Sequence, residues 1–443
     1  MLRILHTSDW HLGQHFIGKS RDACHRAFFQ WLTETIQTQQ IDVLLVAGDI
    51  FDTATPPSYA RELYHQLLAD LYRLKVQVIV LGGNHDSVAV LNESASLLKV
   101  LNTCVIPGLA ADLSTHLQPL YDQAGFPAAM LVALPFVRAR DLSAHQGLLS
   151  VAGQTEQQKN RDLQQQLGQL YETLYQLATK QAADLAASYQ QQTGQPRQIP
   201  VLGSGHLTTV GASRSESVRE IYIGSLEAFR ADGFPPFAYL ALGHIHQAQQ
   251  VGGNPFFRYC GAPLALGFDE ANQHKQVLQI DISDQGEVQL PVALPVPDVQ
   301  PLASLTVNLA TVRACVQQEL SRRGFTEEPH HRVGKTLWLE LILSGEDALL
   351  TDVQAQLQQQ LAELPVELLK LRRAKTAETS LVQAQLTLQE LTPEDVFAER
   401  LAHEQLSDET KLRLSQLHAD VLSQVQLAAQ PAATLLASAE VTP

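Results

Sequence analysis

The chain has 443 residues and a formal net charge of −15. This length exceeds one ordinary hydrophobic core and predicts two or three domains, while the acidic balance argues against a surface that binds nucleic acid unaided. No stretch of about 18 apolar residues occurs, so a membrane span is not expected. No signal peptide precedes the first predicted strand, and the cysteines lack CxxC spacing, so we expect free thiols in the cytoplasm at Cys24, Cys104, Cys260 and Cys315.

Predicted strands and helices alternate in the part of the chain that precedes residue 250. Short apolar runs, bounded by glycine or polar residues, predict strands that are buried on both faces. Longer stretches with apolar residues at helical spacing separate the first three runs. In chain order, the predicted strands cover residues 3–6, 43–47, 76–81, 199–202 and 238–242, and the helices cover 21–38 and 57–74. This alternation predicts an α/β fold.

A polar motif follows each predicted strand, and every motif contains residues that ligate metals. The motifs are Asp9-Trp10-His11, Gly48-Asp49, Gly83-Asn84-His85-Asp86, Gly205-His206 and Gly243-His244-Ile245-His246. Any one of them alone is as readily a hydrogen-bonded turn, but their shared placement favours a single site, because open α/β sheets bind ligands beyond the carboxyl ends of their strands. Carboxylate, amide and imidazole groups suit divalent metals. The set is large enough for two metals, which act together in displacements at phosphorus.

Residues 154–195 are rich in glutamine and carry leucines at helical spacing, so we expect a long packing helix. Its expected apolar face contains Leu163, Leu167, Leu170, Leu174 and Leu177. Prolines at 291–301 mark the predicted domain boundary, beyond which strand and helix patterns predict a small α+β domain over residues 300–380. Gly334-Lys335-Thr336 lacks the upstream glycine of a phosphate-binding loop, so this chain is not expected to bind ATP.

The C-terminal segment is predicted to form two amphipathic helices over residues 390–430. Phe397 and Leu401 share one apolar face of the first helix. Such helices either pack on their own domain or dock on a partner, and the residues alone leave both alternatives open. Residues 390–443 hold nine acidic and three basic side chains, so part of the acidic charge lies away from the predicted site. Residues 431–443 are expected to be disordered.

The set of motifs resembles that of the calcineurin-like metallophosphoesterases, and the residues around it are similar to one branch, the bacterial SbcD nuclease subunits. The similarity is carried by residues 6–14, 47–53, 56–61, 83–88 and 91–94. It is most specific over residues 1–105 and 203–270. The resemblance implies a four-layer αββα sandwich over residues 1–290, a small α+β capping domain over 300–380 that helps to select DNA, and a C-terminal helical pair.

Carried over position by position, the resemblance implies two divalent metals, with manganese expected first and magnesium as the alternative. The implied ligands are Asp9, His11 and His246 for one metal, Asn84, His206 and His244 for the other, and Asp49 as a bridge between them. His85 is implied as the catalytic residue, which donates a proton to the leaving 3′-oxygen or stabilises it. Asp52 or Asp86 is the expected partner that orients His85.

The implied function is that of the nuclease subunit of an ATP-dependent DNA end-processing complex in recombination, replication and repair. Its activities would be 3′–5′ double-strand exonuclease and single-strand or hairpin endonuclease, with an SbcC-like coiled-coil ATPase as partner. The C-terminal helices would dock on that ATPase. Helices near residues 60–75 and 88–101 would form a homodimer, and the complex would lie in the cytoplasm at the nucleoid.

Two alternatives stay open on the residues alone. One is a calcineurin-like phosphatase or cyclic-nucleotide phosphodiesterase that acts on a small phosphoester. The other is a non-catalytic scaffold built on an inactive phosphoesterase core, against which the complete ligand set argues. An assay with manganese that compares linear duplex DNA with a small phosphomonoester separates the three hypotheses.

Overall fold

The computed structural model divides the chain into two compact units, Met1–Arg373 and Ala374–Pro443. It describes residues 1–145, 156–213, 215, 228–325, 336–344, 353–374 and 413–414. The predicted helical pair over 390–430 and the tail over 431–443 therefore lie outside the described residues, apart from Arg413 and Leu414. In the described part of the chain, no helix is long and apolar enough to span a bilayer.

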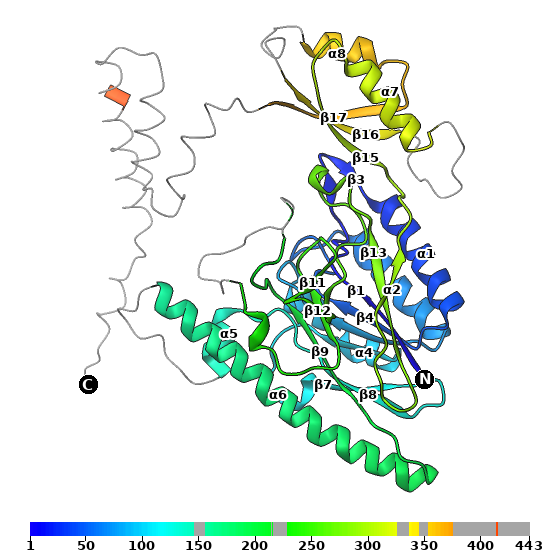
Figure 1. Cartoon of the computed structure of the whole chain (residues 1–443), viewed down its shortest axis with the longest axis vertical. Coiled ribbons are helices and arrows are strands. Elements are labelled where there is room, and N and C mark those ends of the chain that lie inside the picture. Colours follow the sequence, from blue (N-terminus) through cyan, green and yellow to red (C-terminus); the bar gives the residue numbers. More distant parts are fainter. Residues whose placement is uncertain are drawn as a thin grey trace, which may run out of the picture. The chain divides into compact units, whose positions relative to one another are not determined.

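The first unit is built on two six-stranded sheets (Figure 1). The central strands of the first sheet are parallel, as strands joined by helices require, and β13 pairs with β1 in the antiparallel sense. Its order is β14 (Val292–Pro295), β13 (Gln276–Ile282), β1 (Leu2–Thr7), β4 (Val43–Ala47), β5 (Gln77–Leu81) and β6 (Thr103–Ile106). Helices α1 (Asp22–Gln39) and α2 (Ser58–Arg73) pack on its outer face.

The second sheet carries the long helix α6 (Glu156–Thr193) on its outer face (Figure 1). Its order is β11 (Gln249–Val251), β12 (Asn254–Tyr259), β10 (Leu240–Gly243), β9 (Val201–His206), β8 (Pro127–Val132) and β7 (Leu117–Tyr121). Leu177 was predicted on the buried face of α6 but is 41% exposed. The buried stripe continues through Ala178 and Ala182 instead, because a residue four positions after Leu174 lies about 40° from it around the helix, whereas one three positions after lies about 60° away.

Three apolar clusters separate the layers of this unit. Leu45 and Ile79 of the first sheet face the second sheet, where they meet Leu202 of β9. Their neighbours Leu44 and Val78 point the other way and pack under α1 and α2. Strands buried on both faces explain why the sequence shows continuous apolar runs rather than alternation. The predicted αββα sandwich is therefore confirmed.

A small α+β domain follows the proline-rich segment, as predicted. Its three parallel strands are β15 (Leu302–Val307), β16 (Leu337–Leu343) and β17 (Val366–Arg373), and its helices are α7 (Val312–Arg322) and α8 (Val353–Leu361). We call it the cap. The cap contacts the sandwich through Trp338, which stacks on Phe16 with ring centroids 5.5 Å apart, and Phe16 in turn meets Phe268.

Short elements complete the first unit and bring loops to the strand ends. They are the β2 (His15–Phe16) and β3 (Lys19–Ser20) hairpin, helices α3 (Val88–Glu93), α4 (Ala95–Val100) and α5 (Ala139–His145), and the 3₁₀ turns η1 (Leu113–His116), η2 (Ala231–Gly233) and η3 (Phe268–Glu270). The largest difference from a predicted strand end is at β9, which extends through the Gly205-His206 motif instead of ending before it. Gly205 permits this, because a β-carbon there would lie 2.4 Å from the Tyr171 hydroxyl of α6.

Candidate metal centre

The five polar motifs converge at the carboxyl ends of strands from both sheets. β1, β4 and β5 deliver the first three motifs, and β9 and β10 deliver the other two. The structure brings together all eight residues singled out in the sequence: Asp9, His11, Asp49, Asn84, His85, His206, His244 and His246. All are buried except Asn84, which is half-buried. The parallel central strands of each sheet cause this convergence, because they end at one edge.

One group of potential ligands consists of Asp9, His11 and His246, whose ligand atoms lie within 4.8 Å of one another. The Nε2 atom of His11 is buried and has no hydrogen-bond partner among the described residues, and it lies 3.6 Å from Asp49 Oδ2. A buried imidazole nitrogen without a partner is costly. A bound cation would remove that cost.

The second group consists of Asp49, His206 and His244, with Asn84 beside them. His206 Nε2 lies 3.3 Å from Asp49 Oδ2 and 3.0 Å from Asn84 Oδ1, and Asn84 Oδ1 lies 2.9 Å from His244 Nδ1. Adjacent ligands in an octahedral shell with bonds of about 2.1 Å are about 3.0 Å apart. The separations and the mixture of nitrogen and oxygen donors therefore fit a divalent metal.

Backbone groups fix the directions of these side chains. His206 Nδ1 donates to the Ala47 carbonyl at 2.8 Å, so Nε2 is the nitrogen that would bind a cation. Asp9 Oδ1 accepts the His244 amide at 2.9 Å, and Asp49 Oδ1 accepts the His85 amide at 2.9 Å. Each carboxylate thus joins two motifs from distant parts of the chain.

Four of the candidate ligands have left-handed backbone conformations, which are rare for residues other than glycine. The φ angles are 55° at Asp9, 47° at His11, 52° at Asp49 and 92° at His244. Such conformations cost about 1–3 kcal/mol each and cluster at functional sites, where the surrounding structure maintains them. Gly48 has φ 93°, and a β-carbon there would lie 2.2 Å from His206 Nδ1. The sequence did not indicate the left-handed conformations of these candidate ligands.

His85 lies beside both groups, with its ring centroid 4.8 Å from that of His11. Its Nδ1 donates to the backbone carbonyl of Asp52 at 2.8 Å. The expected orienting partner was a carboxylate, but the contact comes from the main chain. Asp86 instead accepts the amides of Gly83, Ile50 and Phe51, and so ties two motif loops together. Burial lowers the pKa of His85, so its ring is neutral near pH 7.

The cluster has a strongly negative character. Although burial opposes protonation of His206, the charge of Asp49 raises the pKa of His206 to about 9. Burial likewise opposes ionisation of Asp49, yet His206 holds the pKa of Asp49 well below its usual range. These opposite shifts arise because each group stabilises the charged form of the other, so the Asp49 carboxylate favours a positive charge beside it.

A cavity of about 620 Å³ gives access to the cluster. His11, His85 and His246 line one side, and the cap lines the other. The cap side contains Lys370 and Arg372 of β17, whose charges Glu340 of β16 partly compensates from 3.1 Å and 3.7 Å. The candidate ligands therefore face a cleft that has basic groups on its opposite wall.

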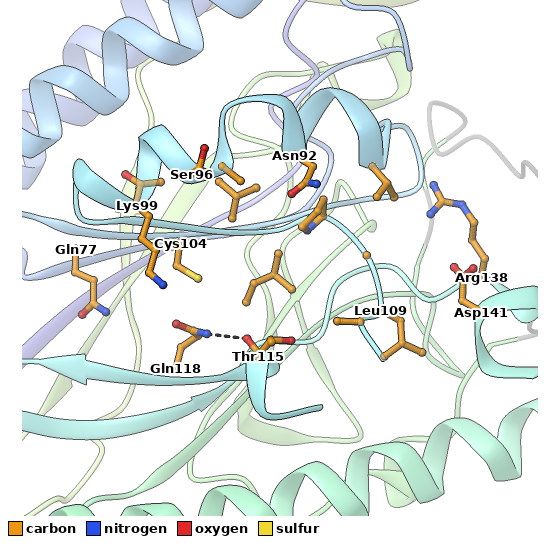
Figure 2. Close-up of a pocket in the computed structure, with 18 of the residues that line it drawn as sticks. Gln77, Asn92, Ser96, Lys99, Cys104, Leu109, Thr115, Gln118, Arg138 and Asp141 are labelled. Carbon is orange, nitrogen blue, oxygen red and sulfur yellow. Dashed lines mark hydrogen bonds between the residues drawn. The ribbon is translucent and has the colours of Figure 1, made fainter. Parts of the chain in front are cut away.

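A second cavity, of about 950 Å³, lies between the edge strands β6 and β7 and beneath α3 and α4 (Figure 2). Lys99 and Gln118 reach into it, and Arg138 at its end donates to the carbonyl of Asp86 at 3.4 Å. Asp141 is the one carboxylate among the residues that line it. This cavity lacks the donors of a metal site, so the ligand chemistry is confined to the first cleft in the part of the chain that is described.

Comparison with known families finds two matches, one over the N-terminal part of the sandwich and one that includes the cap. Residues 2–185 match the calcineurin-like phosphoesterase family. Residues 298–405 match a family described as the type 5 capsule protein repressor C-terminal domain. The first match contains Asp9, Asp49, Asn84 and His85, and the second contains the described strands of the cap.

Several curated proteins are similar over most of their length. The SbcD subunit of the SbcCD nuclease from Escherichia coli (strain K12) is 42% identical over 423 residues, which is 95% of this chain and 98% of the relative. The protein of the same description from Rhodobacter capsulatus is 34% identical over 409 residues, 90% of this chain and 94% of the relative. That from Bacillus subtilis (strain 168) is 30% identical over 285 residues, 63% and 66% of the two chains.

Proposed function

The chain belongs to the SbcD family of nuclease subunits within the calcineurin-like phosphoesterases, and from this premise we propose how it cuts DNA. It is a metal-dependent hydrolase of phosphodiester bonds. We propose that its substrates are the ends and hairpins of double-stranded DNA, which it processes as a 3′–5′ exonuclease and a single-strand endonuclease. Its place is in DNA recombination, replication and repair.

The position of one carboxylate between the two ligand groups supports the two-metal proposal. Asp49 Oδ2 lies 3.6 Å from His11 Nε2 of the first ligand group and 3.3 Å from His206 Nε2 of the second. The proposed ligands are Asp9, His11 and His246 for one metal, Asn84, His206 and His244 for the other, and Asp49 for both. Manganese suits this mixture of imidazole and oxygen donors, with magnesium as the alternative. When bound, the pair would activate water and neutralise charge on the phosphate.

His85 is the proposed catalytic side chain. Its Nδ1 is committed to the Asp52 carbonyl, so Nε2 is the nitrogen that can exchange a proton with a reacting oxygen. Burial keeps the free ring neutral. A phosphodiester placed beside the ring adds negative charge, which favours the protonated ring and lets Nε2 donate to the leaving 3′-oxygen.

The cleft supports DNA rather than a small phosphoester as the substrate. A cavity of about 620 Å³, walled on one side by Lys370 and Arg372 of the cap, leaves room for a polymer backbone. Contacts with phosphates position a nucleic acid without reading its sequence. A phosphatase for small esters has little use for a separate domain that places Lys370 and Arg372 over the site.

A direct assay tests this function. The full chain with manganese should degrade linear duplex DNA and leave a small phosphomonoester intact. The His85→Gln variant should bind manganese as the wild type does but lose turnover by about 10²–10⁴-fold. Hydrolysis of the small ester alone would overturn the nuclease proposal, and wild-type turnover in His85→Gln would refute the role of His85.

We propose that the chain works with an SbcC-like coiled-coil ATPase, because it lacks a phosphate-binding loop and its relatives are described as subunits of an SbcCD nuclease. The docking segment would be the predicted helices over 390–430. Replacing Phe397 and Leu401 by Asp should abolish the complex, and an intact complex would exclude this segment.

We also propose a homodimer in the cytoplasm, with its interface near α2 and α4. Large apolar side chains are exposed there: Tyr72 of α2 is 46% exposed, and Leu97 and Val100 of α4 are 64% and 72% exposed. Large apolar groups exposed on these helices favour a protein interface.

A further inference from the structure

Glu270 is a buried carboxylate that no sequence motif indicated. It ends the η3 turn and is 0% exposed. Its Oε1 accepts a hydrogen bond from His246 Nδ1 at 3.2 Å, across a separation of 24 residues. The ring of His246 belongs to the first ligand group, with Asp9 and His11. Glu270 therefore stands directly behind a candidate metal ligand.

Several donors hold the Glu270 carboxylate in one position. Its Oε2 accepts Lys275 Nζ at 2.6 Å and the Leu266 amide at 3.1 Å, while its Oε1 also accepts the Ser215 hydroxyl at 2.8 Å. Lys275 additionally donates to the backbone carbonyl of His246 at 3.3 Å. Both the ring and the main chain of His246 are thus tied to one buried ion pair.

This arrangement determines which nitrogen of His246 faces the metal group. When Nδ1 carries the proton that it donates to Glu270, Nε2 presents a free lone pair. A carboxylate behind a ligating imidazole also increases its basicity and restricts rotation of the ring. We propose that Glu270 is a positioning residue that fixes the tautomer and orientation of His246 for metal binding. The inference rests on the proposed function, in which His246 is a ligand.

The second ligand group has its own means of orientation. His206 Nδ1 donates to the Ala47 carbonyl, with no contribution from Glu270. Loss of the Glu270 carboxylate should therefore weaken one metal site and spare the other. A purely structural role for the Glu270–Lys275 pair predicts instead that both sites weaken together, through general loosening of the fold.

Manganese titration of the full chain, without DNA, separates these outcomes. We expect Glu270→Ala to weaken one of the two binding events by about 10–100-fold and to leave the other unchanged. Glu270→Gln keeps the side-chain volume and should give a smaller loss at the same event. The control is Glu319→Gln. Like Glu270, Glu319 is a carboxylate held by basic side chains, here Arg322 and Arg323, but it lies on α7 in the cap. The Glu319→Gln variant should bind both manganese ions with wild-type affinity.

Unfolding in the presence of a chelator shows whether each variant is folded. Wild-type affinity at both sites in a Glu270 variant would overturn the inference, as would equal weakening of both sites in folded Glu270→Gln. The same titration distinguishes failure of the proposed two-metal function from failure of the Glu270 inference, because in the former case the wild type would bind fewer than two manganese ions.

Discussion

Gly83→Ala tests whether the backbone between the second and third motifs sets the position of Asp49. A β-carbon at residue 83 would lie 2.1 Å from Asp49 Oδ1 and 2.3 Å from the Asp49 amide nitrogen. Ordinary contacts of β-carbons begin at 3.4 Å, and separations below 3.0 Å do not persist. The Asp49 carboxylate or the loop must therefore move by about 1 Å, the scale at which misplacement in a catalytic site matters.

A displacement of this size in a catalytic group lowers the rate by about 10²-fold, which corresponds to about 2.7 kcal/mol of transition-state stabilisation. The shift would also break the bond between the His85 amide and Asp49 Oδ1, which is 2.9 Å long in the structure. Manganese-dependent degradation of linear duplex DNA measures the loss of rate, and manganese titration measures the loss of affinity.

Gly168→Ala is the matched control for this prediction. Gly168 lies inside α6, and a β-carbon there would have no neighbour closer than 3.9 Å. Alanine should leave the nuclease rate unchanged and stabilise the helix by about 0.5–1 kcal/mol. Wild-type nuclease rate and metal affinity in Gly83→Ala would refute the reasoning, because the clash would then have been absorbed without moving Asp49.

Three further predictions follow from the same structure. Removal of metals by a chelator should lower the free energy of unfolding by about 2.7 kcal/mol per site, relative to manganese at 100 times its Kd; an unchanged melting temperature would argue against metal binding. Trp338→Ala should cost about 3 kcal/mol and loosen the cap on Phe16, measured by unfolding and by protease cleavage of the cap; wild-type values would contradict this. Asp at both Leu97 and Val100 should yield monomers in sedimentation experiments, and persistent dimers would place the interface elsewhere.

Much of the arrangement of strands and polar motifs around the candidate metal centre was predictable from local sequence patterns. The runs Val43–Ala47 and Gln77–Leu81 are apolar at every or nearly every position because both faces of those strands are covered, and this is visible without the fold. The motifs follow such runs, so their convergence at the carboxyl ends of the strands could be inferred from the topology of α/β proteins. The end of β9 was misplaced, since the strand continues through Gly205 to His206, and β10 begins two residues later than predicted, at Leu240.

The hydrogen-bond partners of the site residues were harder to predict from the sequence. The carboxylate of Asp52 or Asp86 was expected to orient His85, but the structure uses the backbone carbonyl of Asp52. The Asp86 carboxylate binds three amides of the neighbouring loops. Main-chain acceptors carry no sequence signal, since every residue has one. Which of them reaches a side chain depends on loop geometry.

By itself, the sequence determined the fold class, the order of the motifs and the candidate donors of a metal centre, because burial periodicity and ligand chemistry are properties of local residue types. Only the tertiary structure decided that Asp49 lies between the two ligand groups, that four ligand backbones are left-handed, and that Glu270 stands behind His246. These features depend on contacts between distant segments. Their energies arise when the strands and turns pack together, and no local pattern of residues specifies them.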